Sequence, residues 1–494
     1  MIELALIGIA VLIFDLFLTP EQKRWNAWLA LFGVAVSAGA VTYRIVYHPT
    51  LLAGADSISA FGGAVIMDRF AIYFFYLFLA GAAVAILMSV KYLEIERENH
   101  GEFYALILFS VVGMMGMACG HDIVLLFISL ELMALSTYVL VGFLRRDQRS
   151  NEAALKYLLL GAFSSGIFAY GLSLFYGLSG STNIRAIAQA LESHYRNNPN
   201  DPVAILALIT VATGVLFKVA AVPFHQWAPD AYEGAPTTIT GYMSVAVKAA
   251  GWVLLLRIFL YMLYPLRPAY VPMLIFVSIA TMTGGNLAAL TQDNTKRLLA
   301  YSSISHVGYM LLGLVAGTAY VANPTGIKGI LVYLLVYTFM NLGAFAVITS
   351  LRRRDIIGDN ISDLDGLMQK APTEAILMLI FLLSLAGIPP LAGFYGKYFI
   401  FLSLMETGHY TLAAVAVLYA VLGLYYYLKI ANAMLMRPVA NAEPIAMSAG
   451  LRLALAITGI ATVGIGLLPD VFIKAVNWSL STPQASSIAN LVGR

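Results

Sequence analysis

Long apolar runs separated by short polar breaks are the dominant pattern along the chain. A membrane-spanning helix needs about 20 predominantly apolar residues, so each run is a candidate span. The pattern predicts an all-α polytopic membrane protein with about 14 transmembrane helices, at residues 2–18, 28–47, 71–90, 104–119, 122–143, 154–178, 203–232, 237–262, 270–290, 297–317, 326–350, 373–409, 411–436 and 451–473. The first run carries Glu3 and Asp15, which favours a span over a cleaved signal peptide.

Two of these windows are interrupted by proline. The apolar run 203–218 is followed by Pro223, and the run 373–388 is followed by Pro389 and Pro390. Sixteen helical residues rise about 24 Å, which falls short of a hydrocarbon core of about 30 Å. Because proline breaks the helical hydrogen-bond ladder, a second piece must complete each crossing. Such a break within a membrane is tolerated where it is buried in protein or lines a wet cavity.

The two breaks lie at comparable places in the chain and predict two inverted five-helix repeats. Residues 104–262 would hold helices 4–8 and residues 270–436 helices 9–13, with helices 1–3 in residues 1–100 and a last helix and tail in residues 437–494. Interrupted helices at matching positions of inverted halves indicate a transport pathway. The alternative is that both breaks are ordinary proline kinks.

Composition strengthens the membrane assignment and excludes several classes of protein. Hydrophobic residues make up 60% of the 494 residues and charged residues 11%, against about 25% charged residues in a soluble domain. A water-soluble enzyme and a disordered chain are therefore excluded. A single cysteine, Cys119, excludes a disulfide scaffold and thiolate-held iron–sulfur clusters. The net charge of +3 indicates no nucleic-acid partner.

The loop charges predict the orientation of the chain. With the N-terminus outside, 15 Lys and Arg residues would face the cytoplasm and 9 the opposite side. The bias is clearest at Arg145–Arg149 and Arg352–Arg354, whereas Arg257 and Arg494 count toward the outer side.

Five ionisable residues stand far inside the predicted spans: Glu131, Lys218, Lys248, His306 and Lys397. A charge at the bilayer centre costs at least about 2.5–3.5 kcal/mol on insertion scales, which favours a functional role. Glu131 and Lys218 are expected to be neighbours. Groups about 8 Å apart at an effective dielectric near 20 couple by roughly 2 kcal/mol, enough to pass a protonation change along a row.

Simpler interpretations remain for some of these positions. Glu131 would then be a protonated carboxyl that packs helices, and His306 a satisfied structural residue. Lys156 is a weaker candidate because it lies only two residues inside its span and can reach the interface. The spans contain no cluster of histidines and carboxylates, which disfavours a metal site. No glycine-rich phosphate loop is present either.

Three segments carry a family resemblance over essentially the whole chain. They are FKVAAVPFHQWAPDAYEGAPT, LLAYSSISHVGYMLLG and GIPPLAGFYGKYFIF. Together they resemble the antiporter-like membrane subunits of respiratory complex I. Lys397 stands where the sister subunits more often carry glutamate, so the chain is most similar to the subunit N branch, which includes mitochondrial NADH dehydrogenase subunit 2.

The resemblance implies a proton-pumping, non-redox subunit of NADH:quinone oxidoreductase. Glu131 would pair with Lys218, and Lys248 would connect through His306 to Lys397, with Lys156 at a further polar position. NADH, FMN, iron–sulfur clusters and quinone would bind other subunits, so this chain would have no cofactor and no catalysis alone.

The expected surroundings follow from the same resemblance. The partners would be other membrane subunits, including a neighbouring antiporter-like subunit, together with membrane lipids. The expected location is a bacterial inner membrane, ahead of a mitochondrial one. The alternative is a subunit of a multi-subunit sodium/proton antiporter or of a membrane-bound hydrogenase, and the third possibility is a structural scaffold.

Overall fold

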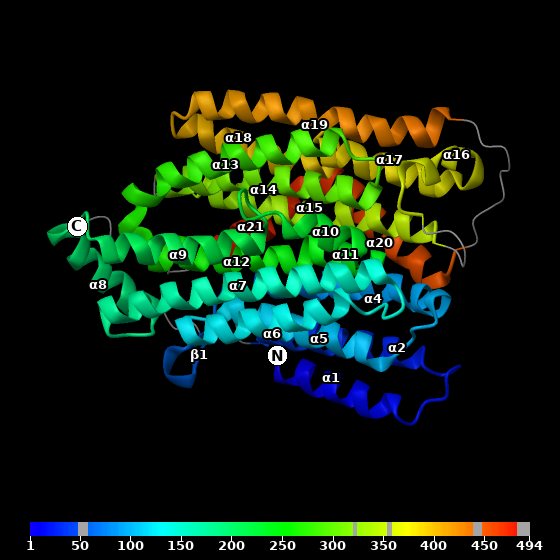
Figure 1. Ribbon diagram of the computed structural model, residues 1–494, viewed down its shortest axis with the longest axis horizontal. Helices are drawn as coiled ribbons and strands as arrows, with labels where there is room; N and C mark the ends of the chain where they lie inside the picture. The colour runs from blue at the N-terminus through cyan, green and yellow to red at the C-terminus, as the bar shows by residue number, and fades with distance from the viewer. Residues whose placement is uncertain (48–57, 320–323, 353–357, 438–446, 482–494) are drawn as a thin grey trace.

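Helices packed side by side form one elongated bundle (Figure 1). The computed structural model describes residues 1–47, 58–319, 324–352, 358–437 and 447–481. Arg353, Arg354, Arg494 and part of the predicted C-terminal division 437–494 lie outside these residues. In Figure 1 helix α8 and strand β1 lie at one end of the bundle and helix α16 at the other.

The N-terminal half contains nine α-helices and a small hairpin in the described residues. The helices are α1 Ile2–Asp15, α2 Trp25–Tyr47, α4 Arg69–Glu96, α5 Gly101–Cys119, α6 Ile123–Val141, α7 Gln148–Ser179, α8 Ile184–Asn197, α9 Pro202–Val219 and α10 Trp227–Gly234. Strand β1 (Ile58–Ala60) pairs antiparallel with β2 (Val65–Met67), and the short helix η1 (Phe61–Gly63) joins them.

The C-terminal half begins with a helix that contains two π-helical turns. This helix runs through α11 Thr237–Tyr242, η2 Met243–Val247, α12 Lys248–Arg257 and η3 Ile258–Met262. The elements after it are η4 Tyr264–Leu266, α13 Arg267–Leu290, α14 Thr295–Ala319, α15 Thr325–Ser350, η5 Ile361–Leu364, α16 Leu367–Lys370, α17 Pro372–Ala386, α18 Ala392–Glu406, α19 Tyr410–Met436, α20 Ala449–Leu467 and α21 Pro469–Leu480.

The predicted all-α membrane fold is confirmed. Within the described residues, twelve helices are long and apolar enough to cross a membrane. Helices α1 (14 residues) and α17 (15 residues) are shorter, so the count of fourteen and the inverted repeats stay predictions. The spans 237–262 and 295–318 are each 94% buried, whereas α2 and α19 are 28% buried. The helices that carry Lys248 and His306 therefore lie at the centre.

Both predicted interruptions are present and have the same local geometry. Helix α9 ends where Ala220 adopts the left-handed conformation and the amide of Ala221 donates to the carbonyl of Leu216 at 2.9 Å. Helix α17 ends where Gly387 is left-handed and the amide of Ile388 donates to the carbonyl of Leu383 at 3.1 Å. Both ends are Schellman-type caps, after which the chain restarts as α10 and α18.

Three predicted segments differ from the observed structure. The sequence predicts a polar loop at 179–202, between two spans. The structure has the amphipathic helix α8 there, whose polar face explains the difference. The segment 47–69 contains the β1–β2 hairpin. The last predicted span, 451–473, is two helices, because α20 ends at Leu467 and Pro469 opens α21 as its first residue.

Candidate functional site

Glu131 and Lys218 do not form the direct ion pair that was expected. The ammonium of Lys218 donates a hydrogen bond to the hydroxyl of Tyr138 at 3.3 Å. Tyr138 stands seven residues after Glu131 on α6, so about 10 Å of helix separates the two. Glu131 still attracts the ammonium electrostatically. One carboxylate oxygen of Glu131, Oε1, is buried without a hydrogen-bond partner.

Lys218 is held in the last turn of α9, just before the first break. Its side chain is 4% exposed and lies against the rings of Tyr138 and Phe217, at 5.6 and 5.7 Å from the ring centres. The C-terminal end of a helix favours a positive charge. The indole of Trp227 donates to the carbonyl of Phe217 at 2.9 Å and ties the start of α10 to the same turn.

Lys248 opens α12 directly after the π-helical turn η2 and is 3% exposed. Its ammonium bonds to the hydroxyl of Ser303 on α14 and lies 5.8 Å from the ring centre of Tyr232 on α10. Gly251, one turn further, lets α12 approach α9: a Cβ there would be 3.4 Å from the backbone carbonyl of Lys218. The helices of the two lysines are therefore in contact.

His306 lies within the electrostatic influence of both Lys248 and Lys397. The imidazole is 2% exposed. Its Nδ1 is hydrogen-bonded to the hydroxyl of Tyr333, and its Nε2 lies 2.9 Å from the hydroxyl of Tyr427. Ser303 is one turn before His306 on α14, so one helix face presents both groups.

Lys397, on α18, reaches back across the second break. Its ammonium donates to the carbonyls of Leu385 and Ala386 at 3.2 and 2.6 Å, which are the last carbonyls of α17. The ammonium also lies 5.5 Å from the ring centre of Tyr309 on α14, one turn beyond His306. Lys397 is 7% exposed, and its contact with Tyr309 places it beside the helix that carries His306.

Lys218, Lys248, His306 and Lys397 thus occupy one interior, and hydroxyl groups stand between them. No carboxylate forms an ion pair with any of the three lysines in the described part of the chain. The hydroxyls of Tyr232 and Tyr337 are buried nearby without a hydrogen-bond partner. Sequence reasoning missed Tyr138, Tyr333 and Tyr427 as individual partners, because tyrosines are frequent among these helices.

Lys156 belongs to a different group, at the edge of the bundle. It is 46% exposed and pairs with Glu152 at 2.7 Å and with Asp230 at 3.1 Å. Arg297 completes the group by pairing with Asp230 and Glu233, both at 2.8 Å. A cavity of about 220 Å³ lies among these side chains. Lys156 is therefore not part of the buried row.

A buried charged group occupies the end of the bundle near the hairpin. Arg257, counted from the sequence as an outer-side charge, is fully buried in α12 and pairs with Asp68 at 2.7 Å. Its guanidinium also approaches Nε2 of His121 at 3.5 Å, while Nδ1 of His121 faces the carbonyl of Cys119 at 3.3 Å. Burial, with Arg257 adding to it, lowers the pKa of His121 to about 3.

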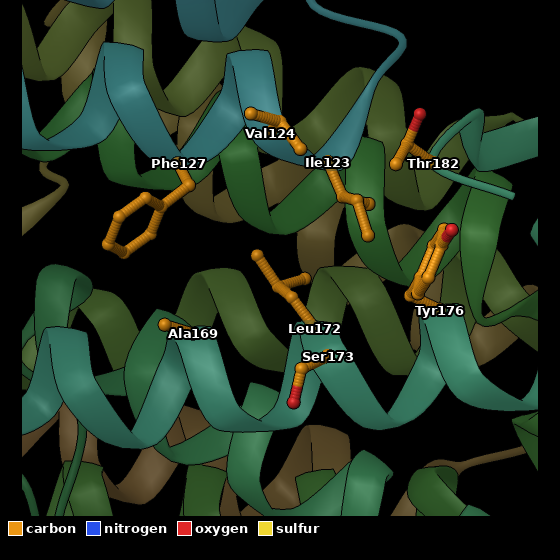
Figure 2. A pocket seen from close by; sticks show the side chains of 8 residues that line it. All are labelled: Ile123, Val124, Phe127, Ala169, Leu172, Ser173, Tyr176 and Thr182. Atoms are coloured by element: carbon orange, nitrogen blue, oxygen red, sulfur yellow. The ribbon is translucent and has the colours of Figure 1, made fainter.

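An apolar pocket of about 360 Å³ lies between α6 and α7, apart from the buried row (Figure 2). Ile123 and Phe127 of α6 face Leu172 and Tyr176 of α7 across it. None of its lining side chains is an Asp, Glu, Lys, Arg or His. The residues that the structure describes also contain no cluster of three or more potential metal ligands.

Comparison with known proteins points to one family. The family described as NADH:quinone oxidoreductase/Mrp antiporter, TM, matches residues 120–423, more than half of the chain. NADH-quinone oxidoreductase subunit N 1 of Koribacter versatilis is 67% identical over 495 residues, covering 100% of this chain and 96% of that protein.

Solved structures are similar over the same length. A chain of respiratory complex I from Thermus thermophilus with bound aureothin has a TM-score of 0.78 and 32% identity, covering 96% of this chain and 98% of that one. A chain of the Mrp complex from Dietzia has a TM-score of 0.80 at 20% identity, covering 98% of both, and shows the shared fold.

Proposed function

Because the chain belongs to the NADH:quinone oxidoreductase/Mrp antiporter family of membrane proteins, in its subunit N group, we propose that it translocates protons along the buried row from Glu131 to Lys397. Redox energy released in other subunits would drive this movement. The chain would be a non-redox part of an NADH:quinone oxidoreductase, with NADH, FMN, iron–sulfur clusters and quinone on its partners.

The observation that carries this proposal is the placement of His306. The imidazole has a hydroxyl at each ring nitrogen and lies within the electrostatic influence of two lysines, Lys248 and Lys397. An imidazole can take up a proton at one nitrogen while releasing one from the other. In the proposed relay His306 would pass protons from Lys248 toward Lys397.

The lysines suit a relay because, within the described residues, their hydrogen-bond partners are neutral groups. The ammonium of Lys248 meets a serine hydroxyl, and that of Lys397 meets two backbone carbonyls. Without a carboxylate in contact, no ion pair stabilises the charged form of a buried lysine. Its ammonium can therefore give up a proton. Glu131 lies about 10 Å along α6 from Tyr138, the hydrogen-bond partner of Lys218. Its charge would modulate the protonation of Lys218.

The function is tested in the assembled complex with Lys218→Ala and Glu131→Gln. We expect fewer protons translocated per electron at unchanged assembly, with Lys91→Ala as a control because Lys91 pairs with Glu94 at the surface. A normal proton-to-electron ratio in both assembled variants would favour a structural scaffold instead. The isolated chain is expected not to oxidise NADH.

The same proposal covers location and partners. The bacterial relative named above supports a multi-pass protein of a bacterial inner membrane, bordered by lipids and by other membrane subunits, one of them antiporter-like. A sodium/proton antiporter or hydrogenase role has less support, because the likeness to the Mrp complex is one of fold at 20% identity. Co-migration of the chain with NADH dehydrogenase activity on a native gel tests this choice.

A further inference from the structure

Helix α10 is a short element that reaches the surroundings of two lysines of the row. It has eight residues and is flanked by the first break and by Pro236. At its start Trp227 is hydrogen-bonded to the carbonyl of Phe217, the residue before Lys218. Further along, the ring of Tyr232 lies beneath the ammonium of Lys248 at 5.8 Å. A displacement of α10 would therefore alter both sites together.

Charged side chains of α7 and α14 contact α10 through its two carboxylates, Asp230 and Glu233. Each carboxylate oxygen of Asp230 has its own cation: Oδ2 meets Lys156 of α7 at 3.1 Å, and Oδ1 meets Arg297 of α14 at 2.8 Å. Arg297 also pairs with Glu233 at 2.8 Å, so a single guanidinium joins two carboxylates one turn apart.

Lys296, the residue before Arg297, contacts the C-terminal end of α10. Lys296 is 3% exposed, and its ammonium donates to the carbonyl of Ala235 at 2.8 Å. Ala235 caps the C-terminal end of α10, where a cation is favourable. The first turn of α14 therefore holds α10 at three points, and α14 also carries Ser303 and His306.

These contacts contribute to local placement more than to overall stability. Asp230, Glu233 and Arg297 are about one-third exposed, and ion pairs of this kind are each worth up to about 1 kcal/mol. A helix of eight residues is too short to be stable by itself in water, and breaks at both ends remove any hydrogen-bonded continuation. The position of α10 therefore depends on the packing of its buried residues and on the side chains that link it to α7 and α14.

We propose that Asp230, Glu233 and Arg297 are positioning residues for the proton row, which fix α10 so that Tyr232 stays against Lys248 and Trp227 against the turn of Lys218. This inference rests on the proposed function. It assigns to the charged group at the bundle edge a role in coupling that is distinct from proton transfer itself.

The test compares Arg297→Gln, Arg297→Lys and Asp230→Asn in the assembled complex. The control is Arg437→Gln, because Arg437 forms a similar partly exposed ion pair with Asp365 away from α10. We expect Arg297→Gln and Asp230→Asn to lower the proton-to-electron ratio about twofold or more, with uncoupled NADH oxidation retained. Arg297→Lys should restore much of the ratio, and the control should leave it unchanged.

Lys248→Ala serves as the reference that separates the two proposals. If Lys248→Ala pumps normally, the proposed function fails. If Lys248→Ala loses pumping while Arg297→Gln and Asp230→Asn keep the normal ratio, the positioning role alone is overturned. A lower amount of complex with an unchanged ratio in the two variants would show a purely structural role and would also overturn it.

Discussion

The ammonium of Lys218 and the hydroxyl of Tyr138 are 3.3 Å apart, and this hydroxyl takes the place next to Lys218 where a carboxylate was expected. Glu131 and Tyr138 are on the same helix, two turns apart, and Glu131 also acts on Lys218 through its charge. The contact makes Tyr138 a candidate link in the proposed relay.

Tyr138→Phe should therefore weaken proton translocation while leaving the fold intact. The substitution removes one hydroxyl from a buried hydrogen bond to a charged group, which costs about 1.5–3 kcal/mol, and keeps the ring against Lys218. We expect a lower proton-to-electron ratio in the assembled complex, measured with reconstituted vesicles. Tyr176→Phe is a control, because Tyr176 lines the apolar pocket far from the lysines. Equal ratios in the two variants would contradict the link.

Lys397→Glu should be more harmful than Lys397→Met. The ammonium satisfies the carbonyls of Leu385 and Ala386 at the negative end of α17. A carboxylate there would face like partial charges, whereas methionine loses the hydrogen bonds without adding repulsion. Both variants should lose pumping, and Lys397→Glu should also lower the amount of assembled complex, measured on native gels. Normal assembly of Lys397→Glu would show that α18 can turn this side chain elsewhere.

Two glycines on α20 form a matched pair for testing the second break. A Cβ at Gly466 would lie 2.3 Å from the carbonyl oxygen of Pro390, whereas a Cβ at Gly464 would meet nothing within 4 Å. Gly466→Ala should lower stability by about 1–3 kcal/mol through overpacking, and Gly464→Ala should not. The melting temperatures of the two purified variants measure this difference. Similar values would mean that the break moves freely.

The buried His121 should make the fold more stable at pH 7 than at pH 5. Burial and Arg257 lower the pKa of His121 to about 3, against about 6.5 when unfolded. Between these values the unfolded chain binds a proton that the folded chain does not, so stability falls as pH falls below about 6.5. The loss is on the order of 2 kcal/mol at pH 5.

The measurement is thermal unfolding at pH 7 and pH 5 for the original chain and for His121→Gln. The variant cannot titrate at this position, so its stability should depend less on pH over this range. Asn198→Gln is a surface control, because Asn198 is exposed at the end of α8. Identical pH dependence in the original chain and His121→Gln would rule out this contribution.

The sequence indicates the two interrupted helices because proline and left-handed caps act locally. The short apolar run before Pro223 and the one before Pro389 each end in the observed break. The sequence also reveals the charged residues within the spans. A lysine such as Lys248 in an apolar run is costly unless protein surrounds it, so its burial in the bundle could be predicted. Such signals depend on neighbours along the chain, which a sequence displays directly.

Partnerships across helices could not be predicted in the same way. Tyr138 stands beside Lys218, although 80 residues separate them. Arg257 lies near the end of its apolar run and resembles a loop charge until Asp68, 189 residues earlier, is brought against it. These contacts depend on how helices turn about their axes, and apolar periodicity is weak where helices are buried on all sides.

The imidazole of His306 has one tyrosine oxygen at each ring nitrogen, and this arrangement would limit how often a proton can pass through it. When a proton arrives on one side and another departs from the opposite side, the ring is left as its other tautomer and both hydroxyls point the wrong way. A second passage must wait until they swing back. Such an imidazole would pass one proton at a time and would have to return to its first tautomer before the next.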